Sequence, residues 1–343
     1  MATIQGVAEL AGVSTATVSR ALSGKSTVSA ATRQKVEDAA RSLGYVASAT
    51  ASSLASGRTR NVGIVMPFLG SWYYANVLKG AHRALADAGY DLTLYHLEDT
   101  TRHPERRRRL FNEFLGRKRV DAFIAVSLEL TKEELGRIHD LGKPMVGLGG
   151  PLAGVTTLSL DDRAVAELAT SHLTSLGHRR IAFIGGTEGF DLDFHLPKRR
   201  RQGWEDALTA VGAPVDPALR LEGDFTIEGG HRAALQILGD PRRRPTAIFA
   251  ASDEMAIGAI LAARSLGLRV PEDVSVIGID GHELGQFFEL TTVDQRPVEQ
   301  GRLAAETLLA ELRPQASQQH PALRLPYDLT VRRSTAVAPG RHD

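Results

Sequence analysis

The stretch GVSTATVSRALSGKSTVS, residues 12–29, is small, rich in hydroxyl groups and nearly free of acid. Its apolar residues Val18, Ala21 and Leu22 fall within about 100° of helical arc, and Ser14 stands where an N-cap is expected. The opposite side of the same helix carries the small or polar residues Thr15, Ala16, Ser19 and Arg20. The pattern predicts a short helix with an exposed polar edge.

Two further helices are predicted around this one. The first opens at Thr3 and places apolar residues on one face, namely Ile4, Val7, Leu10 and Ala11. A tight turn at Gly12 follows it, and Ala8 is small enough for the helices to cross closely. The third follows Ser29, stops at Gly44 and carries Val36, Ala39, Ala40 and Leu43. This order is a helix-turn-helix, whose second helix can enter a DNA major groove; an amphipathic helix with a merely solvated face is the alternative.

The charge of the chain is unevenly distributed. The formal net charge is +1, but residues 1–60 hold seven Lys or Arg and three Asp or Glu, so this head carries +4. A basic head on a slightly acidic body favours contact with a polyanion.

After the head, apolar strands alternate with amphipathic helices. Strands are predicted at 61–67, 90–97, 121–127, 144–150, 179–186, 219–224, 246–252 and 274–280. Helices are predicted near 74–88, 104–117, 131–141, 162–176, 198–211, 227–238 and 253–266. Two such series indicate two α/β lobes with parallel sheets, and a cleft between lobes is a common place for a small ligand.

Composition excludes several classes of protein. The chain has 343 residues, 43% of them apolar, and no cysteine, so disulfides, thiolate metal sites and cysteine nucleophiles are excluded. No signal peptide or membrane span is predicted, and we expect a cytoplasmic protein with no membrane partner. The histidines show no metal-binding spacing and GGTEG (185–189) lacks the spacing of a phosphate loop, so no metal, cofactor or catalytic residue is expected. Three arginine runs, 106–109, 199–201 and 242–244, are interpreted as solvated helix faces or loops and not as a second nucleic-acid surface, except that Arg200 has a separate candidate role in ligand binding.

Several stretches together resemble the lactose and galactose repressor family of bacterial transcription regulators. They include TIQGVAELAGVSTATVSRALSG, STVSAATRQKVEDAARSLGY, SSLASGRTRNVGIVMP, LGHRRIAFIGG, AASDEMAIGAI and VPEDVSVIGIDG, in family order over nearly the whole chain. The resemblance implies an N-terminal all-α helix-turn-helix DNA-binding domain with a hinge helix, followed by a two-lobed α/β core like that of periplasmic binding proteins. It also implies a homodimer, double-stranded operator DNA as partner and a small-molecule effector, expected to be a sugar.

The resemblance assigns roles in DNA binding. Thr15, Ala16 and Arg20 occupy base-reading positions, and Leu54 matches a wedge that enters the minor groove. Phosphate or hinge contacts are expected from Thr3, Ser14, Thr17, Ser19, Ser29, Thr32 and Ala51. By composition alone, residues 47–60 are equally well interpreted as a flexible linker.

The resemblance also assigns an effector site. Its expected residues are Tyr73, Tyr74, Arg200, Phe225, Ser252, Asp280 and Gln295. Aromatic faces stack on sugar C–H surfaces, while Arg and Asp bind hydroxyls by charge-assisted hydrogen bonds. Gly149 and Leu196 depart from the polar residues of sugar-binding members.

The expected domains are a DNA-binding domain at 1–46, a hinge at 47–60, a two-lobed core at 61–335 and a tail at 336–343. The first lobe is expected to hold 61–160 and 293–320, and the second 161–292 and 321–335. The sequence thus predicts a transcriptional repressor of carbohydrate uptake or catabolism genes, with the effector acting as inducer or co-repressor. A solute-binding protein for transport has a similar core, and a nucleotide-dependent enzyme is a third hypothesis; operator binding distinguishes the first from both.

Overall fold

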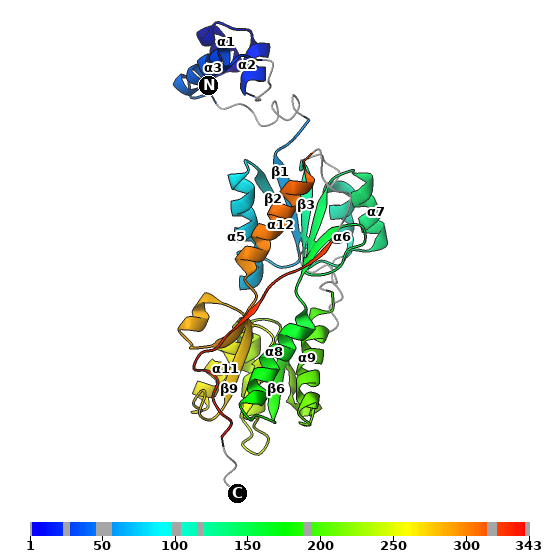
Figure 1. The fold of residues 1–343 in the computed structure, drawn as a ribbon, viewed down its shortest axis with the longest axis vertical. Coiled ribbons are helices and arrows are strands. Elements are labelled where there is room, and N and C mark those ends of the chain that lie inside the picture. The colour runs from blue at the N-terminus through cyan, green and yellow to red at the C-terminus, as the bar shows by residue number, and fades with distance from the viewer. Residues whose placement is uncertain are drawn as a thin grey trace.

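The computed structural model describes residues 2–22, 28–45, 57–97, 104–114, 119–187, 194–313 and 321–339. Three helices form the N-terminal unit at the top of Figure 1: α1 (Ile4–Ala11), α2 (Thr15–Leu22) and α3 (Ala30–Ser42). Of the predicted hinge, residues 47–56, including Ala51 and Leu54, lie outside the described residues.

The N-terminal helices begin and end as their residues predict. The Thr3 side chain accepts a hydrogen bond from Gly6 N at 3.2 Å, and Ser29 accepts one from Thr32 N at the same distance. Gly12 ends α1 at φ +66°, a left-handed conformation that favours glycine. These caps satisfy backbone donors at the starts of α1 and α3 and backbone acceptors at the end of α1.

A small core holds the three helices together. Val7, Val18 and Val36 are fully buried against alanines of all three helices. Two residues of the predicted apolar faces are not buried: Leu10 is 57% exposed and Leu43 is 41% exposed. A bundle of three short helices is too small to cover every apolar side chain, and these two lie at its edge.

The first lobe contains a six-stranded parallel sheet in the order β11-β5-β4-β3-β1-β2. Its strands are β1 (Asn61–Met66), β2 (Asp91–His96), β3 (Ala122–Val126), β4 (Met145–Leu148), β5 (Thr156–Ser159) and β11 (Ala322–Arg324). Its helices are α5 (Trp72–Asp87), α6 (Pro104–Arg109) with the π-helical turn η1 (Leu110–Phe114), α7 (Lys132–Asp140) and α12 (Pro297–Glu311). Apolar clusters cover both faces of the sheet, as parallel sheets require.

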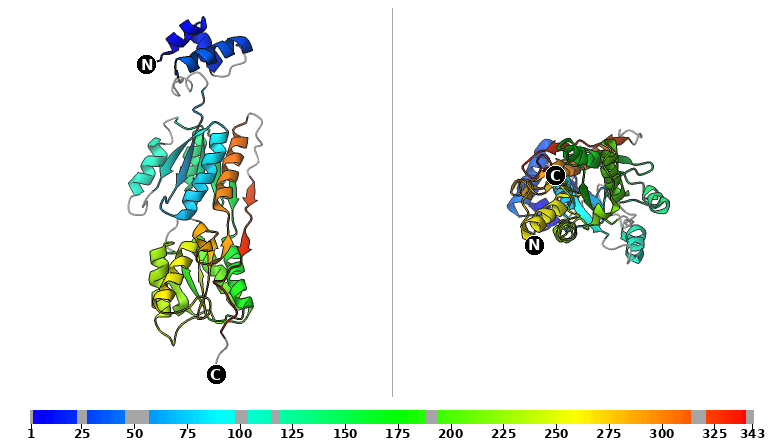
Figure 2. Two further views of the ribbon diagram at one scale, coloured as in Figure 1. Left: turned by 90° about the vertical axis from the view of Figure 1, so that its left-hand side faces the viewer. Right: turned by 90° about the horizontal axis from the view of Figure 1, so that it is seen from below.

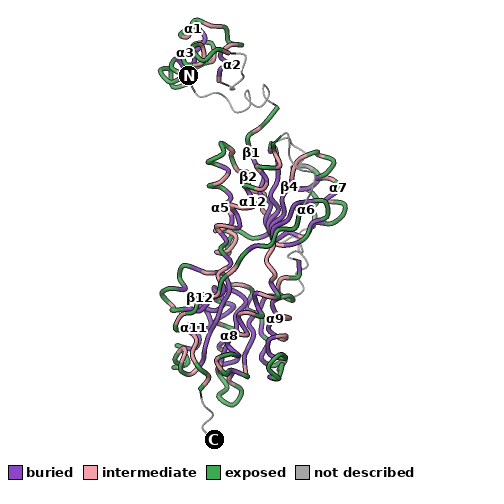
Figure 3. The backbone as a smooth tube through the Cα atoms, viewed as in Figure 1, coloured by how far each residue is buried: buried purple, intermediate pink, exposed green. Residues whose placement is uncertain are grey.

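The second lobe contains a six-stranded sheet in the order β12-β10-β9-β8-β6-β7. Its strands are β6 (Ile181–Gly185), β7 (Arg220–Glu222), β8 (Ala247–Ala250), β9 (Ser275–Asp280), β10 (Thr291–Asp294) and β12 (Asp328–Thr330). Its helices are α8 (Asp162–Ser175), α9 (Leu196–Ala210), α10 (Ile227–Leu238) and α11 (Asp253–Ser265), with the short turns η3 (Pro217–Leu219) and η4 (Glu283–Gln286). The sheet is parallel apart from β12, which pairs antiparallel with β10. Figure 3 shows the buried strands enclosed by helices in both lobes.

The described chain passes between the lobes at 160–161, 295–296 and 325–327. The predicted boundaries at 293 and 320 therefore need correction. Leu290 and Val293 are buried in the core of the second lobe, so β10 completes that sheet before the chain crosses. The chain returns only after β11, which pairs with β5 in the first lobe.

Helix predictions agree with the structure to within a few residues, with one larger difference. The helix predicted at 104–117 is α6 followed by the π-helical turn η1 up to Phe114. None of the described helices is both long and apolar enough to cross a membrane.

Helices α5 and α12 lie side by side, in cyan and orange in Figure 2, and two glycines allow their backbones to come close. A Cβ at Gly80 would lie 1.8 Å from the Val298 carbonyl oxygen, and one at Gly301 would lie 1.9 Å from the Val77 carbonyl oxygen. The two helix backbones therefore touch where the middle of α5 crosses the start of α12.

Candidate DNA-reading face and effector cavity

The outer edge of α2 carries the predicted base-reading residues. Thr15, Ala16 and Arg20 are exposed, whereas Val18 on the opposite side is fully buried. Thr17 and Ser19 are half-buried at the margins of this edge. The edge is narrow and carries one long cation, so the helix backbone can approach a groove closely.

The hydroxyl residues predicted to contact phosphate also cap the helices. Ser14 and Thr17 share a hydrogen bond of 2.9 Å at the start of α2, and Ser29 and Thr32 share an identical one at the start of α3. The first turns of α1, α2 and α3 contain no acidic residue. The positive ends of the helix dipoles are thus not neutralised by carboxylates, which favours phosphate there.

A cavity of about 720 Å³ lies between the two lobes. All seven predicted effector residues line it: Tyr73, Tyr74, Arg200, Phe225, Ser252, Asp280 and Gln295. The two tyrosines come from the first turn of α5 in the first lobe, and Arg200, Ser252 and Asp280 come from helices and strand ends of the second. The structure therefore brings together residues that lie up to 222 positions apart in the sequence.

Arg200 is fixed in the wall of this cavity. It is 3% exposed, its Nε lies 3.0 Å from Asp162 Oδ1, and its Nη2 lies 2.9 Å from the same oxygen. Its Nη1 donates to the Ala251 carbonyl oxygen. A guanidinium has five N–H donors, so Arg200 keeps donors for a ligand beyond these contacts.

A chain of hydrogen bonds joins the lobes beside Arg200. The Tyr73 hydroxyl donates to Gln300 Oε1 at 2.9 Å, and Gln300 Nε2 donates to the Gln295 carbonyl oxygen at 2.6 Å. Gln295 in turn donates to Asp280. Burial raises the pKa of the Tyr73 phenol, so Tyr73 stays neutral and can donate.

Asp280 forms a buried acidic pair with Asp253. Asp280 Oδ2 accepts from Asp253 N at 3.2 Å, and Asp253 Oδ2 accepts from His282 N at 2.8 Å. Burial, and then the charge of Asp253, raise the pKa of Asp280 well above its ordinary value. Burial likewise raises the pKa of Asp253 to about 6. The pair therefore holds a proton more readily than exposed carboxyls.

Aromatic rings line the apolar walls. Tyr73 and Tyr74 meet edge to face with ring centroids 5.2 Å apart, and Phe68 lies 5.8 Å from Tyr74. Phe225 adopts φ +55°, and its ring lies where a Cβ at Gly186 would be 2.1 Å away. The backbone of a non-glycine residue is strained at positive φ, and such strained residues cluster at ligand-binding sites.

Sequence reasoning missed other lining residues, among them Phe68, Ser71, His96, Ser127, Asp162, Asp224, Glu254 and Gln300. Asp162 and Glu254 had a usable signal, since each lies in the first turn of a helix that follows a strand. Gly149 and Leu196 also line the cavity. Among the described residues, no cluster of three or more His, Cys, Asp or Glu is placed to hold a metal ion.

Family models match both parts of the chain. The model described as "Bacterial regulatory proteins, lacI family" matches residues 3–48, and that of a periplasmic binding protein-like domain matches residues 170–335. The chain is 34% identical over 342 residues to the HTH-type transcriptional repressor CytR of Escherichia coli (strain K12), covering 98% of this chain and 97% of CytR. It is 33% identical over 340 residues to the repressor PurR of Haemophilus influenzae (strain PittEE), covering 97% and 98%.

Solved structures agree over the same length. A complex of the transcriptional regulator CelR with cellobiose has a TM-score of 0.70 at 32% identity and covers 97% of this chain and 100% of that one. The lac repressor dimer bound to operator and the anti-inducer ONPF has a TM-score of 0.82 at 27% identity and covers 98% and 99%.

Proposed function

Because the chain belongs to the lacI family of bacterial regulatory proteins, we propose that it is a homodimeric, sequence-specific repressor of carbohydrate uptake or catabolism genes. Each protomer reads half of a palindromic operator, and a small effector, a sugar, changes operator affinity. The observation that carries this proposal is the cavity between the lobes, which all seven expected effector residues line.

The exposed edge of α2 suits direct reading of bases. Arg20 can donate two hydrogen bonds to one guanine, and the methyl groups of Thr15 and Ala16 can contact thymine. Ser14, Thr17, Ser29 and Thr32 lie at the N-terminal ends of α2 and α3, and Ser19 lies one turn further along α2; we propose all five as phosphate contacts. Thr3, the N-cap of α1, is likewise proposed as a phosphate contact. Ala51 and Leu54 of the hinge are proposed as minor-groove contacts.

The charges in the cavity favour a neutral effector. Arg200 forms an ion pair with Asp162. Asp280 and Glu254 also line the cavity, and neither lies within 4.0 Å of a cationic nitrogen of the described residues. Burial raises the pKa of Asp280 and Glu254, so they can hold protons, but a phosphorylated sugar would still lie against acidic groups while Arg200 is already paired with Asp162. A neutral sugar instead donates its hydroxyls to Asp280 and Gln295, accepts from Arg200, and stacks on Tyr73 or Phe225. The relative CelR was solved with cellobiose, and another family member with ribose, which are both neutral.

An effector acts through its different affinity for two arrangements of the lobes. We propose that effector binding rotates the first lobes across the dimer, so that the hinges no longer meet in the minor groove and operator affinity falls. An effector that favours the operator-bound arrangement would act as co-repressor.

The test is operator binding. Genome-wide footprinting of the full chain identifies operators, and a labelled operator is then titrated with and without a panel of neutral sugars and their phosphates. Neutral sugars are expected to change the affinity and phosphates are not. Unchanged affinity across the panel would contradict the sugar effector, and binding no tighter than to random DNA would contradict the repressor.

Variants of α2 and α3 supply a matched pair. Arg20→Ala is expected to cost about 1 to 3 kcal/mol at one operator base pair. Arg41→Ala removes the same charge from exposed α3, where Arg41 pairs with Asp38 at 3.2 Å. If both variants weaken operator and random DNA equally, Arg20 contacts phosphate and reads no base.

A further inference from the structure

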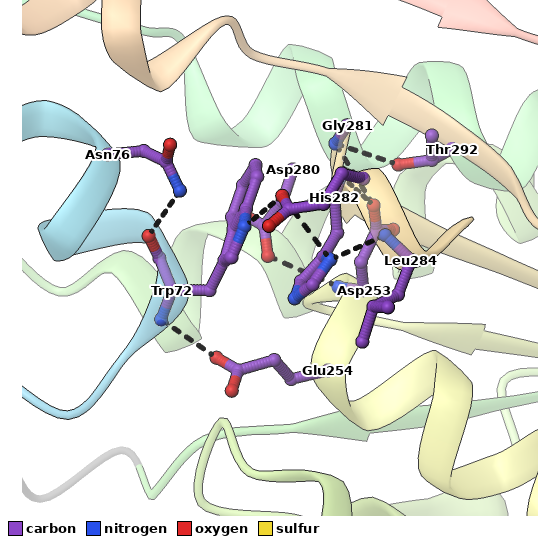
Figure 4. Close-up of polar contacts among 10 residues, drawn as sticks. Trp72, Asn76, Asp253, Glu254, Asp280, Gly281, His282, Leu284 and Thr292 are labelled. Carbon is purple, nitrogen blue, oxygen red and sulfur yellow. Dashed lines mark hydrogen bonds and ion pairs between the residues drawn. The ribbon is translucent and has the colours of Figure 1, made fainter. Parts of the chain in front are cut away.

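Trp72 contacts residues of the second lobe, as Figure 4 shows, and its chain neighbours Ser71 and Tyr73 line the effector cavity. It begins α5 in the first lobe, and its indole stacks on the imidazole of His282 in the second, with centroids 4.4 Å apart and planes at 19°. The Trp72 indole N–H also donates to the Glu283 carboxylate. We call these three residues the interlobe clasp.

The backbone of Trp72 makes a second contact across the lobes. Ser71 is the N-cap of α5 but makes no side-chain capping bond to the helix. The Trp72 N–H points instead to Glu254 Oε2 at 3.4 Å, and Glu254 lies in the first turn of α11 in the second lobe. Burial raises the pKa of Glu254, while the Trp72 N–H and Ser71 lower it. A carboxylate of one lobe thus lies at the positive end of a helix of the other.

His282 is held firmly for this stack. Its N–H and that of Gly281 both donate to Asp253 Oδ2, at 2.8 and 3.0 Å, and its Nδ1 accepts from Leu284 N at 3.0 Å. Asp253 is the partner of Asp280, which lines the cavity. Asp253 and Asp280 therefore connect His282 of the interlobe clasp to the wall of the effector cavity.

We propose that Trp72 and His282 are positioning residues of the effector cavity, whose stack holds the two lobes closed. This inference rests on the proposed function only in naming the cavity's ligand an effector. Opening the lobes would break three contacts at once: the stack of the Trp72 and His282 rings, the indole hydrogen bond to Glu283, and the contact of Glu254 with the N-terminal end of α5. The clasp consequently favours closure in the empty protein and slows the escape of a bound ligand.

The experiment measures lobe separation without effector or DNA. The chain has no cysteine, so donor and acceptor dyes can be attached specifically through Lys132→Cys in α7 and Glu228→Cys in α10, both exposed positions. Labelled chains are mixed with excess unlabelled chain, so that each assembly reports one protomer. Single-molecule energy transfer then gives the ratio of closed to open molecules.

Trp72→Ala is expected to lower the closed-to-open ratio about two- to tenfold, from the usual worth of an aromatic pair. Trp72→Phe keeps a ring on His282 and is expected to restore most of the closed population. Asn76→Ala is the matched control, since Asn76 donates to the Trp72 carbonyl oxygen at 3.0 Å within α5. It should leave the distribution as in the wild type.

Identical distributions for Trp72→Ala, Asn76→Ala and the wild type would overturn the proposal. A second readout uses the Trp204→Phe background, where Trp72 is the remaining tryptophan of the two in the chain. Its fluorescence should be protected from acrylamide, and full accessibility to acrylamide would also overturn the proposal. Operator binding, measured in parallel, distinguishes failure of the clasp from failure of the proposed function.

Discussion

Replacing Arg200 with leucine tests whether this residue both stabilises the fold and binds the effector. The Arg200 and Asp162 side chains are 4% and 9% exposed and lie 2.9 Å apart. Arg200→Leu keeps the apolar stem but leaves the Asp162 carboxylate buried without its cation. The variant also loses the donors that the proposed function assigns to the effector.

The cost follows from the burial of the pair. Breaking a buried ion pair by removing one partner costs about 3 to 5 kcal/mol, because a desolvated charge is left unpaired. Removing both charges is far less costly, since apolar residues of similar size replace such pairs at about zero net cost. Arg200→Leu should therefore lower the free energy of unfolding by about 3 to 5 kcal/mol, and Asp162→Leu with Arg200→Leu should recover most of this loss.

Urea unfolding of the full chain measures stability, and operator titration with an active sugar measures the effector response. The double variant is expected to be nearly as stable as the wild type but insensitive to the sugar. A loss below about 1 kcal/mol in the single variant would refute the structural role of the pair, since that is the range of exposed pairs. A double variant that still responds to the sugar would refute Arg200 as a ligand.

The remaining predictions concern backbone, protonation and capping. Gly281→Ala should cost on the order of 2 kcal/mol in urea unfolding, because Gly281 has φ +79° and a Cβ there would lie 2.3 Å from Asp294 Oδ1. Gly142→Ala is its control, at φ +61° with nothing within 4 Å of the Cβ, and an equal cost would show that crowding contributes nothing. The raised pKa of Asp253, about 6 against 3.8, means that the folded state binds the proton more tightly, so its contribution to the free energy of unfolding falls as the pH rises from 3.8 to 6. Asp253→Asn should remove that fall when its stability is compared with the wild type across this range; parallel curves would contradict it. Ser14→Ala should cost about 1 kcal/mol by removing the cap of α2, seen as a lower thermal midpoint, whereas an unchanged midpoint would show that the 3.2 Å bond to Thr17 N contributes nothing.

Local features of the fold were predictable because their causes are local. Thr3, Ser14 and Ser29 precede helices and cap them, and Gly12 ends α1 in the left-handed region. Burial depends instead on the size of the whole unit, so Leu10 is exposed although it belongs to the predicted apolar face of α1. The edge of a three-helix bundle cannot be located from periodicity alone.

The effector residues were predictable as a set, but their partners were not. The family resemblance supplied seven positions, and all seven line one cavity. The Asp162 partner of Arg200 and the Gln300 partner of Tyr73 come from other helices, and no sequence spacing encodes those distances. The same holds for Trp72 and His282, which lie 210 residues apart and meet only because the two lobes close on each other.

The crossings between the lobes explain how a ligand in this cavity can govern their movement. Each crossing contributes one residue to the lining: Leu160, Gln295 and Leu325. Rotation of one lobe against the other must be absorbed by backbone angles in these short segments, and Arg296 beside Gln295 already has φ +52°. A ligand that binds Tyr73, Gln295 and Asp280 therefore contacts both lobes and one of the segments that join them. Its binding energy can differ between open and closed arrangements without any contact outside the cavity, which is the condition for a small effector to shift the equilibrium.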